Sequence, residues 1–270
     1  QNTPVVVYDE DWQNNRQRVE VNVLKKEKDT DRTLEGAVFG LYAKEDIKSE
    51  TTGKVLIEAD EIIELKSTDQ DGKITFAANL PVGVAYYIKE LYAPDGFVTN
   101  DEVEEFTFDY AGEDQPTVTY DFTFENQPTV VEFTKSSLTT GKELPGCKLK
   151  VVDAEGNVVD EWTSGKEAHV IRELTVGKEY TLIETKPADG YVTAESVKFT
   201  IEDTADIQKV EMKDDVTKLE ISKQDIAGKE LPGAKLTILD QDGKVVESWT
   251  STDKAHYIEM LPIGKYTLRE

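Results

Sequence analysis

Two stretches of this chain are near copies of each other, and this internal repeat constrains the fold more than any other feature of the sequence. The stretch GKELPGCKLKVVDAEGNVV begins at Gly141, and GKELPGAKLTILDQDGKVV begins at Gly228. The glycine, tryptophan and histidine positions of the two copies all lie 87 residues apart. A period of this length, kept without a gap, indicates one structural unit used twice.

A third, more divergent copy precedes these two and carries extra residues. It contains RTLEGAVFGLY around Gly36 and AYYIKELYAPDGF ending at Phe97. The distance from the glycine of the first segment to the glutamate of the second is 54 residues in the first copy, 38 in the second and 37 in the third. The difference predicts an insertion in the first copy, within residues 43–65.

The local pattern inside each copy is that of β-strands. Short alternating runs such as VEVNV, YTLIE and VKFTIE are separated by the turn signals DQDG, AEGN and APDG. Glu58–Leu65 is the one segment with helical periodicity. Several short strands in a unit of about 90 residues predict an all-β fold of tandem antiparallel β-sandwich domains.

The repeats divide the chain into four parts. We predict two complete domains, at residues 16–127 and 128–215, and a third at 216–270 that stops inside a strand. Residues 1–15 resemble the last strand of a preceding unit. Because the chain also opens with Gln1, we expect it to be a piece of a longer or processed protein.

Composition excludes several classes of function. The 270 residues include 31 Lys and Arg against 55 Asp and Glu, for a net charge of −24. Such a surface repels nucleic acid and anionic headgroups, so neither is an expected partner. One cysteine forms no internal disulfide, and two histidines are too few for a histidine-rich metal site. No apolar run is long enough to span a bilayer, and we expect no membrane contact within this segment.

A lysine recurs on the apolar face of the first strand of every copy. Lys25 continues the alternation of Val21 and Val23, and the same pattern leads to Lys135 and Lys223. Residues two apart in a strand share a face, so each lysine points into the core. A buried ammonium is costly without a partner.

Two further polar groups recur in phase with these lysines. A glutamate ends a tyrosine-bearing strand at Glu90, Glu184 and Glu270. The closing strands of the two complete copies end in an inward amide or acid, Asn126 and Asp214, each nine residues before the next lysine. Asn14 is a candidate for the same role in a preceding unit.

These three groups, buried together, can react with one another. Burial favours the neutral amine of lysine and the protonated acid of glutamate. A neutral amine is a nucleophile, and an acid polarises the carbonyl that it attacks. Attack expels ammonia from asparagine or water from aspartic acid and leaves an amide between two side chains, with proximity as the main driving effect.

The segments LEGAVFGLY, KELYAPDGF and YTLIETKPADGY resemble the Cna B-type, or SpaA-type, repeats of Gram-positive surface adhesins and pilins. That resemblance implies prealbumin-like sandwiches with self-formed isopeptide bonds. It implies one triad of Lys25, Glu90 and Asn126 and another of Lys135, Glu184 and Asp214. Lys223 and Glu270 are then two members of an incomplete third site.

The residues leave two assignments open. Lys26 lies beside Lys25, and Asp215 lies beside Asp214; strand phase favours Lys25 and Asp214. The second copy has ETKPADGY where the family pattern has Ala-Pro, a swap that leaves the turn intact. The chain contains no LPxTG sorting signal and no pilin lysine motif, so cell-wall anchoring and polymerisation are implied by the family alone.

Other conspicuous residues have structural interpretations. Cys147 occupies a slot filled by alanine in the other copies, which predicts a small buried side chain. His169 and His256 occupy the same position in their two repeats, and both are expected to be structural. The DQDG segments at Asp69 and Asp240 lack the full spacing of a calcium loop and predict hairpin turns. We therefore expect no metal and no cofactor.

The sequence predicts a structural stalk of a bacterial cell-surface adhesin or pilin, stapled by Lys–Asn and Lys–Asp bonds. Its partners would be the neighbouring repeats of the same chain, and its location extracellular and attached to the cell wall. It would not be an enzyme, because bond formation is a single autocatalytic turnover. The alternative is a module that binds a host matrix protein or glycan through the insertion of the first domain.

Overall fold

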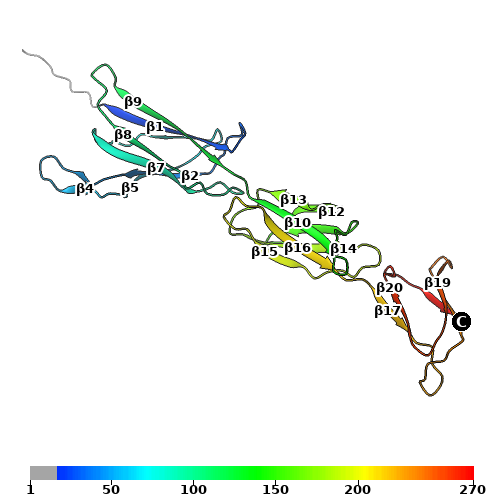
Figure 1. Cartoon of the computed structure of the whole chain (residues 1–270). Helices are drawn as coiled ribbons and strands as arrows, with labels where there is room; N and C mark the ends of the chain where they lie inside the picture. The colour runs from blue at the N-terminus through cyan, green and yellow to red at the C-terminus, as the bar shows by residue number, and fades with distance from the viewer. Residues whose placement is uncertain (1–16) are drawn as a thin grey trace, which may run out of the picture. The chain divides into compact units, whose positions relative to one another are not determined.

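The computed structural model describes residues 17–270, and the predictions made for Asn14 and for residues 1–15 lie outside the described residues. All regular elements in the described part are β-strands, which confirms the all-β sandwich prediction. The chain divides into two compact units, Gln1–Pro128 and Thr129–Glu270. Each unit is described by itself (Figure 1).

The first unit is a sandwich of a three-stranded sheet, ordered β6-β1-β9, and a four-stranded sheet, ordered β5-β2-β7-β8. A separate hairpin pairs β3 with β4. The strands are β1 (Arg18–Glu27), β2 (Val38–Ala43), β3 (Ile47–Lys48), β4 (Val55–Ile57), β5 (Ile62–Ser67), β6 (Lys73–Phe76), β7 (Val84–Tyr92), β8 (Val103–Phe108) and β9 (Thr117–Asn126).

The second unit holds the second and third repeats. The second repeat has a sheet ordered β13-β10-β16 and another ordered β12-β11-β14-β15, and the third has the sheets β17-β20 and β19-β18-β21. The strands are β10 (Val130–Ser137), β11 (Lys148–Val152), β12 (Val158–Thr163), β13 (His169–Arg172), β14 (Glu179–Lys186), β15 (Val197–Thr200), β16 (Gln208–Asp214), β17 (Lys218–Ile221), β18 (Lys235–Leu239), β19 (Val245–Thr250), β20 (His256–Glu259) and β21 (Thr267–Arg269).

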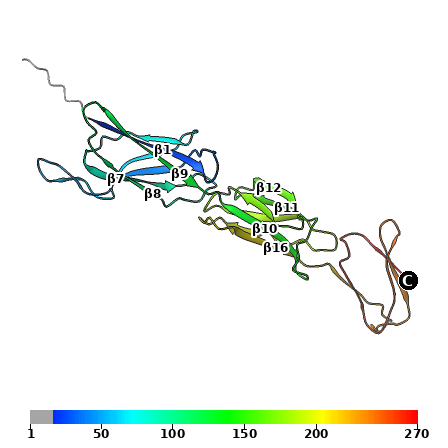
Figure 2. The same cartoon turned by 45° about the horizontal axis from the view of Figure 1, so that its top comes forward.

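One strand pair in each complete sandwich is parallel. The first and last strands of the first repeat, β1 and β9, run side by side in the same direction, and so do β10 and β16 in the second repeat (Figures 1 and 2). The other pairs are antiparallel. The parallel pair brings the carboxyl ends of the first and last strands together, and this is where the inward polar residues lie.

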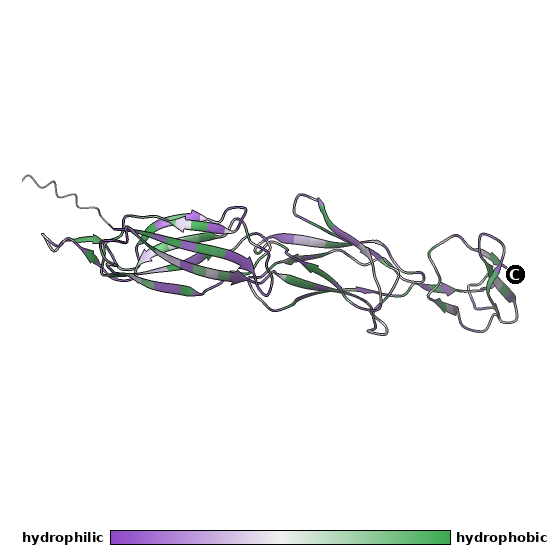
Figure 3. Ribbon diagram, turned by 90° about the horizontal axis from the view of Figure 1, so that it is seen from above, coloured by the Kyte–Doolittle hydropathy of each residue, from purple (hydrophilic) through white to green (hydrophobic). Residues whose placement is uncertain are grey.

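The core of each sandwich follows from strand alternation. In β1 the side chains of Val19, Val21 and Val23 are buried while those of Arg18 and Glu20 are exposed. Figure 3 shows this alternation as hydrophobic and hydrophilic bands along the strands. The inward residues of the two sheets pack face to face, as expected when each strand presents every second residue to the core.

The insertion of the first repeat forms strands rather than a helix. Residues 43–65 contain β3, β4 and the first part of β5. The helix suggested by the periodicity of Glu58–Leu65 is therefore wrong. The backbone N–H of Glu61 donates to the carbonyl of Glu58 in a turn, and Ile62 pairs with Tyr42 of β2. Pairing with a sheet edge outweighs weak local periodicity here. A membrane-crossing helix is not found among the described residues.

Candidate functional site

The first candidate site lies between the two sheets of the first sandwich and is positioned by three strands. Lys25 of β1 is directly opposite Phe124 of β9, so Asn126 follows two residues further along on the same inward face. Glu90 comes from β7 in the facing sheet, where it is paired with Phe39 of β2. Three segments far apart in sequence thus converge on one point of the core.

The three side chains are in direct contact. Lys25 Nζ lies 3.0 Å from Glu90 Oε1 and donates a hydrogen bond to Asn126 Oδ1. Asn126 Nδ2 donates to both carboxylate oxygens of Glu90, at 3.0 and 2.9 Å. The exposed fractions of Lys25, Asn126 and Glu90 are 0%, 1% and 5%, so water is excluded from the group.

Lys25 is buried beside two aromatic rings, and this burial disfavours its charged form. Its Nζ lies 5.4 Å from the ring centre of Phe39 and 5.8 Å from that of Phe124. Burial lowers the pKa of the Lys25 ammonium below its usual value, and the neighbouring Glu90 carboxylate offsets part of that effect. The environment therefore increases the fraction of neutral, nucleophilic amine.

This arrangement is chemically competent for amide exchange. The amine nitrogen of Lys25 faces the amide of Asn126, and Glu90 contacts both the attacking nitrogen and the nitrogen that would leave. A carboxyl group in that place can take a proton from one nitrogen and deliver it to the other. Glu90 is itself held by the backbone N–H of Asn100, which donates to its Oε2 at 2.8 Å.

The second repeat builds the same group with an acid as acceptor. Lys135 of β10 is opposite Met212 of β16, and Asp214 follows two residues later. Lys135 Nζ donates to Asp214 Oδ1 and lies 3.1 Å from Glu184 Oε1. The backbone N–H of Ala194 donates to Glu184 Oε2 at 2.8 Å, as Asn100 does to Glu90. The two sites share both register and orientation.

Asp214 lies in an environment that favours its protonated form. Burial raises the pKa of its carboxyl, and Lys135 opposes that rise. Glu184 raises the pKa further because two neighbouring carboxylates resist ionising together. An Asp214 that keeps its proton is a carboxylic acid, which an amine can attack with loss of water.

Cys147 is fully buried beside this second group, as predicted for a small core side chain. Its Sγ lies 3.8 Å from Asp214 Oδ2, and burial raises the pKa of the thiol to about 11. Cys147, Glu184 and Asp214 place their ligand atoms within 4.8 Å of one another. Lys135 Nζ contacts both carboxylates, so its ammonium lies where a metal cation would bind, and we assign the cluster to the lysine site.

The third repeat brings two predicted residues together in a different environment. Lys223 Nζ and Glu270 Oε2 are 2.8 Å apart, but their side chains are 29% and 57% exposed. The third repeat therefore has the same lysine–glutamate contact as the other two sites, but here the two side chains are exposed to solvent.

The structure separates the neighbouring residues that the sequence left as alternatives. Lys26 is partly exposed and pairs with Asp31 at 3.1 Å. Asp215 pairs with Lys218 at 2.8 Å on the surface. Lys25 and Asp214, in contrast, are buried in the two groups.

Sequence reasoning missed the backbone contacts that orient the glutamates. Asn100 and Ala194 each lie ten residues after the glutamate that they hold. Both donors lie at the same distance beyond their turns, APDGF and PADGY, and this equal spacing was visible in the sequence. Because any residue except proline can donate a backbone N–H, the residue types gave no further indication.

Other features of the described chain have separate roles. His169 stacks on Trp162 at 4.2 Å and bonds Asp160, and His256 stacks on Trp249 at the same distance. Asp69 and Asp240 accept backbone N–H groups of their own turns.

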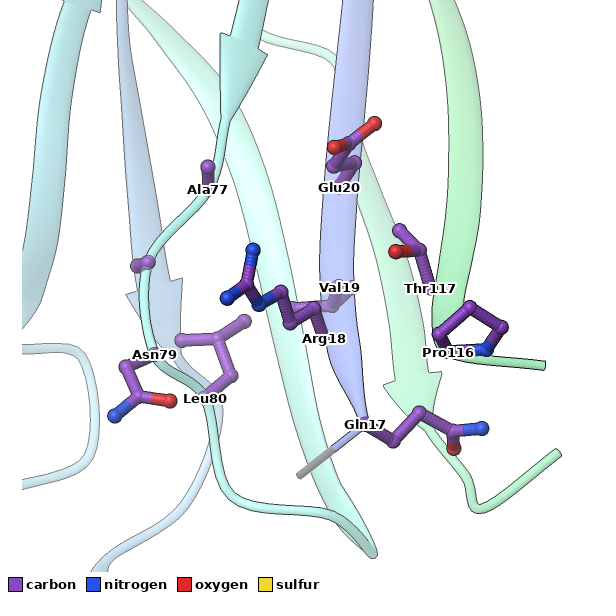
Figure 4. A pocket seen from close by; sticks show the side chains of 10 residues that line it. Gln17, Arg18, Val19, Glu20, Ala77, Asn79, Leu80, Pro116 and Thr117 are labelled. Carbon is purple, nitrogen blue, oxygen red and sulfur yellow. The ribbon is translucent and has the colours of Figure 1, made fainter. Parts of the chain in front are cut away.

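A hollow of about 680 Å³ lies at the start of β1 and holds no cluster of reactive groups (Figure 4). Arg18, Glu20 and Leu80 are among its lining residues. It lies at the opposite end of β1 from Lys25, so it does not open onto the first candidate site.

Comparison with known proteins identifies the type of domain. A family model described as SpaA, a prealbumin-like fold domain, matches residues 19–125, 129–216 and 217–270. No curated protein gives a significant match.

Several solved structures resemble parts of the chain. The Bacillus anthracis TIE protein is 25% identical, with a TM-score of 0.48, over 94% of this chain and 45% of its own length. The Streptococcal ancillary pilin is 22% identical, with a TM-score of 0.32, over 74% of this chain and 63% of its own. The shaft pilin SpaA from Lactobacillus rhamnosus GG is 16% identical, with a TM-score of 0.32, over 74% of this chain and 98% of its own.

Proposed function

Because this chain belongs to the SpaA family of prealbumin-like fold domains, we propose that it is a stalk segment of a bacterial surface adhesin or pilin. In this proposal the two complete sandwiches are each closed by a side-chain amide, between Lys25 and Asn126 and between Lys135 and Asp214. The chain would lie outside the cell, attached to the cell wall, with neighbouring repeats or pilin subunits as its partners. A structural role of this kind requires no enzymatic turnover.

One observation carries the proposal. A buried lysine, glutamate and amide or acid meet in the same strand register in both complete repeats. Both complete repeats contain this costly arrangement, although one has an amide as acceptor and the other an acid. A covalent bond removes the cost by replacing buried charges with a neutral amide.

The reaction balances in both sites. In the first, Lys25 Nζ bonds to Asn126 Cγ, the Cγ–Nδ2 bond breaks, and Glu90 relays a proton from Nζ to the departing ammonia. In the second, Lys135 Nζ bonds to Asp214 Cγ, a carboxyl oxygen leaves as water, and Glu184 relays the proton. Each product is a secondary amide joining the first strand of a sandwich to its last.

The expected benefit is mechanical. The bond in the first sandwich closes a loop between residues 101 apart, for which loop-closure estimates give about 4 to 5 kcal/mol. Force that enters at the start of β1 and leaves at the end of β9 meets the amide before it can separate the strands. A stalk built in this way resists extension by unfolding.

Single-molecule pulling on the full chain tests this function. We expect the wild type to show no extension from the first sandwich, because residues 26–125 lie outside the path of force. Lys25→Met should add a step on the order of 300 Å as the enclosed residues extend.

Lys26→Met is the matched control, since it removes a neighbouring lysine on the surface and should behave as wild type. A wild-type chain that shows the same step as Lys25→Met would overturn the proposal.

A further inference from the structure

The outer face of the sheet β5-β2-β7-β8 in the first sandwich carries two stacked tyrosines. Tyr42 of β2 and Tyr87 of β7 are directly paired across the strands. Their ring centres are 4.8 Å apart and their planes differ by 3°. This face points away from the core and from the Lys25 group, so the stack has no part in the amide chemistry.

Gly40 allows Tyr42 to lie flat against the sheet. A Cβ at Gly40 would come within 2.5 Å of Tyr42 Cε2, so any other residue would displace the ring. Lys89 Nζ lies 5.0 Å from the centre of the same ring. Tyr42 is consequently buried beneath its neighbours, and Tyr87 is the outer member of the stack.

The insertion holds the outer ring in place. The hydroxyl of Tyr87 donates to Asp60 Oδ1 at 3.0 Å, and Asp60 belongs to the inserted residues 43–65. Burial, and then the hydrogen bond to Asp60, raise the pKa of Tyr87 to about 12, so the hydroxyl remains a donor at neutral pH. A tyrosine with both its ring and its hydroxyl fixed is pre-organised as a binding platform.

A shallow hollow of about 400 Å³ opens beside this platform. Its lining residues are Lys44, Asp60, Tyr87, Lys89, Val103 and Glu105. Two of them are cationic and two anionic, and Lys44 forms an ion pair with Glu105. The hollow is therefore close to neutral on a chain whose net charge is −24.

The stack is absent from the equivalent sheet of the second repeat. There Val152 takes the place of Tyr42, and Thr181 takes the place of Tyr87, as the matching strand registers show. The second sandwich forms with the same topology without them. The tyrosines, Gly40 and Asp60 are thus a specialisation of the first repeat that its fold does not require.

We propose that this hollow, the Tyr87 hollow, binds an uncharged saccharide. A sugar ring has an apolar C–H face that packs on a fixed aromatic ring and a rim of hydroxyls that both donate and accept hydrogen bonds. The carboxylates of Asp60 and Glu105 can accept from these hydroxyls, and the ammonium groups of Lys44 and Lys89 can donate to them. A polyanionic glycan would meet repulsion from the acidic surface.

Binding of defined saccharides to the full chain tests the proposal. The probes are maltotetraose, cellotetraose, chitotetraose and lacto-N-tetraose, observed by saturation-transfer NMR with titration of any that binds. We expect at least one to bind, and Tyr87→Ala to weaken it about tenfold or more through loss of the platform.

Tyr92→Ala is the matched control, because Tyr92 is 69% exposed and does not line the hollow. It should leave the affinity unchanged, and the intact mass of each variant reports separately on the amide bonds. Failure of all four probes at millimolar concentration, or equal binding by wild type and Tyr87→Ala, would overturn the saccharide proposal.

Discussion

A lysine with no exposed surface, packed beside two phenylalanine rings, is stable only if its charge is removed or fully compensated. Lys25 Nζ contacts the carboxylate of Glu90, which can compensate its charge, and the amide of Asn126, with which it can react. As an ion pair the group would still carry a desolvation cost. As an amide it would carry none, which is why we interpret these residues as reactants.

The two sites should respond differently to pH as they close. The pKa of Lys25 is lowered by burial, so its neutral amine increases as pH rises and closure of the first sandwich should accelerate. The pKa of Asp214 is raised by burial, so its protonated acid is lost as pH rises. Because this loss opposes the gain in neutral lysine amine, closure of the second sandwich should accelerate less than closure of the first. To measure this, the chain is made by cell-free synthesis and collected in urea, so that it is unfolded and neither amide has formed. It is then diluted into buffers from about pH 5 to about pH 9 to start folding and closure.

Cross-linked peptides sampled over time then report each rate separately. Asp215→Asn, which changes a surface acid next to Asp214, should leave both pH profiles unchanged. Parallel profiles for the two sites would contradict the assignment of amide and acid as different acceptors.

At the residue level the sequence predicted which side chains meet in the two buried groups, with Lys26 and Asp215 left as alternatives. Strand phase pointed to Lys25 rather than Lys26, because a period of two admits one inward residue of each neighbouring pair. It was not sufficient for the tyrosine stack, since Tyr42 and Tyr87 are 45 residues apart in sequence and only the pairing of β2 with β7 makes them neighbours.

At the level of strands, the parallel register of β1 and β9 is what makes the chemistry possible. It places Asn126 two residues beyond the partner of Lys25, and the second repeat keeps this offset for Asp214 and Lys135. Alternation within a strand reveals which face is buried but not which strand is its neighbour. The sandwich was therefore predictable, whereas the parallel pair and the strands of the insertion depended on tertiary pairing.

Within the second unit, a glycine turn of the second repeat contacts the third repeat. Gly190 has φ of +87°, its carbonyl accepts from Thr217 N–H, and an added Cβ would lie 2.6 Å from Met260 O. Gly190→Ala should destabilise this contact by about 1–3 kcal/mol through backbone strain and collision. Faster amide hydrogen exchange at residues 256–259 would report the loss.

Gly156→Ala separates the two causes, because Gly156 has the same φ of +87° and no atom within 4 Å of its added Cβ. It should leave exchange at residues 256–259 unchanged. Equal exchange in the two variants at those residues would show that the contact with Met260 contributes nothing.

At the scale of the whole molecule, the acidic surface and the neutral core have different roles. The chain has a net charge of −24, and most charged residues in its described part are exposed on strand faces and turns. Such charge opposes association of a repetitive β-protein through its sheets. One cysteine leaves no means of disulfide stapling within the chain. We propose that lysine amides stabilise the two complete repeats in place of disulfides. Reducing agents do not break such amides.

The intact mass of the denatured chain tests this central claim most directly. Two amide bonds predict a mass about 35 Da below the sequence value, about 17 Da for ammonia and about 18 Da for water. Glu90→Ala should restore the first increment and Glu184→Ala the second, while Lys26→Met should restore neither. A wild-type mass equal to the sequence value would show that neither sandwich is stapled and would contradict the account.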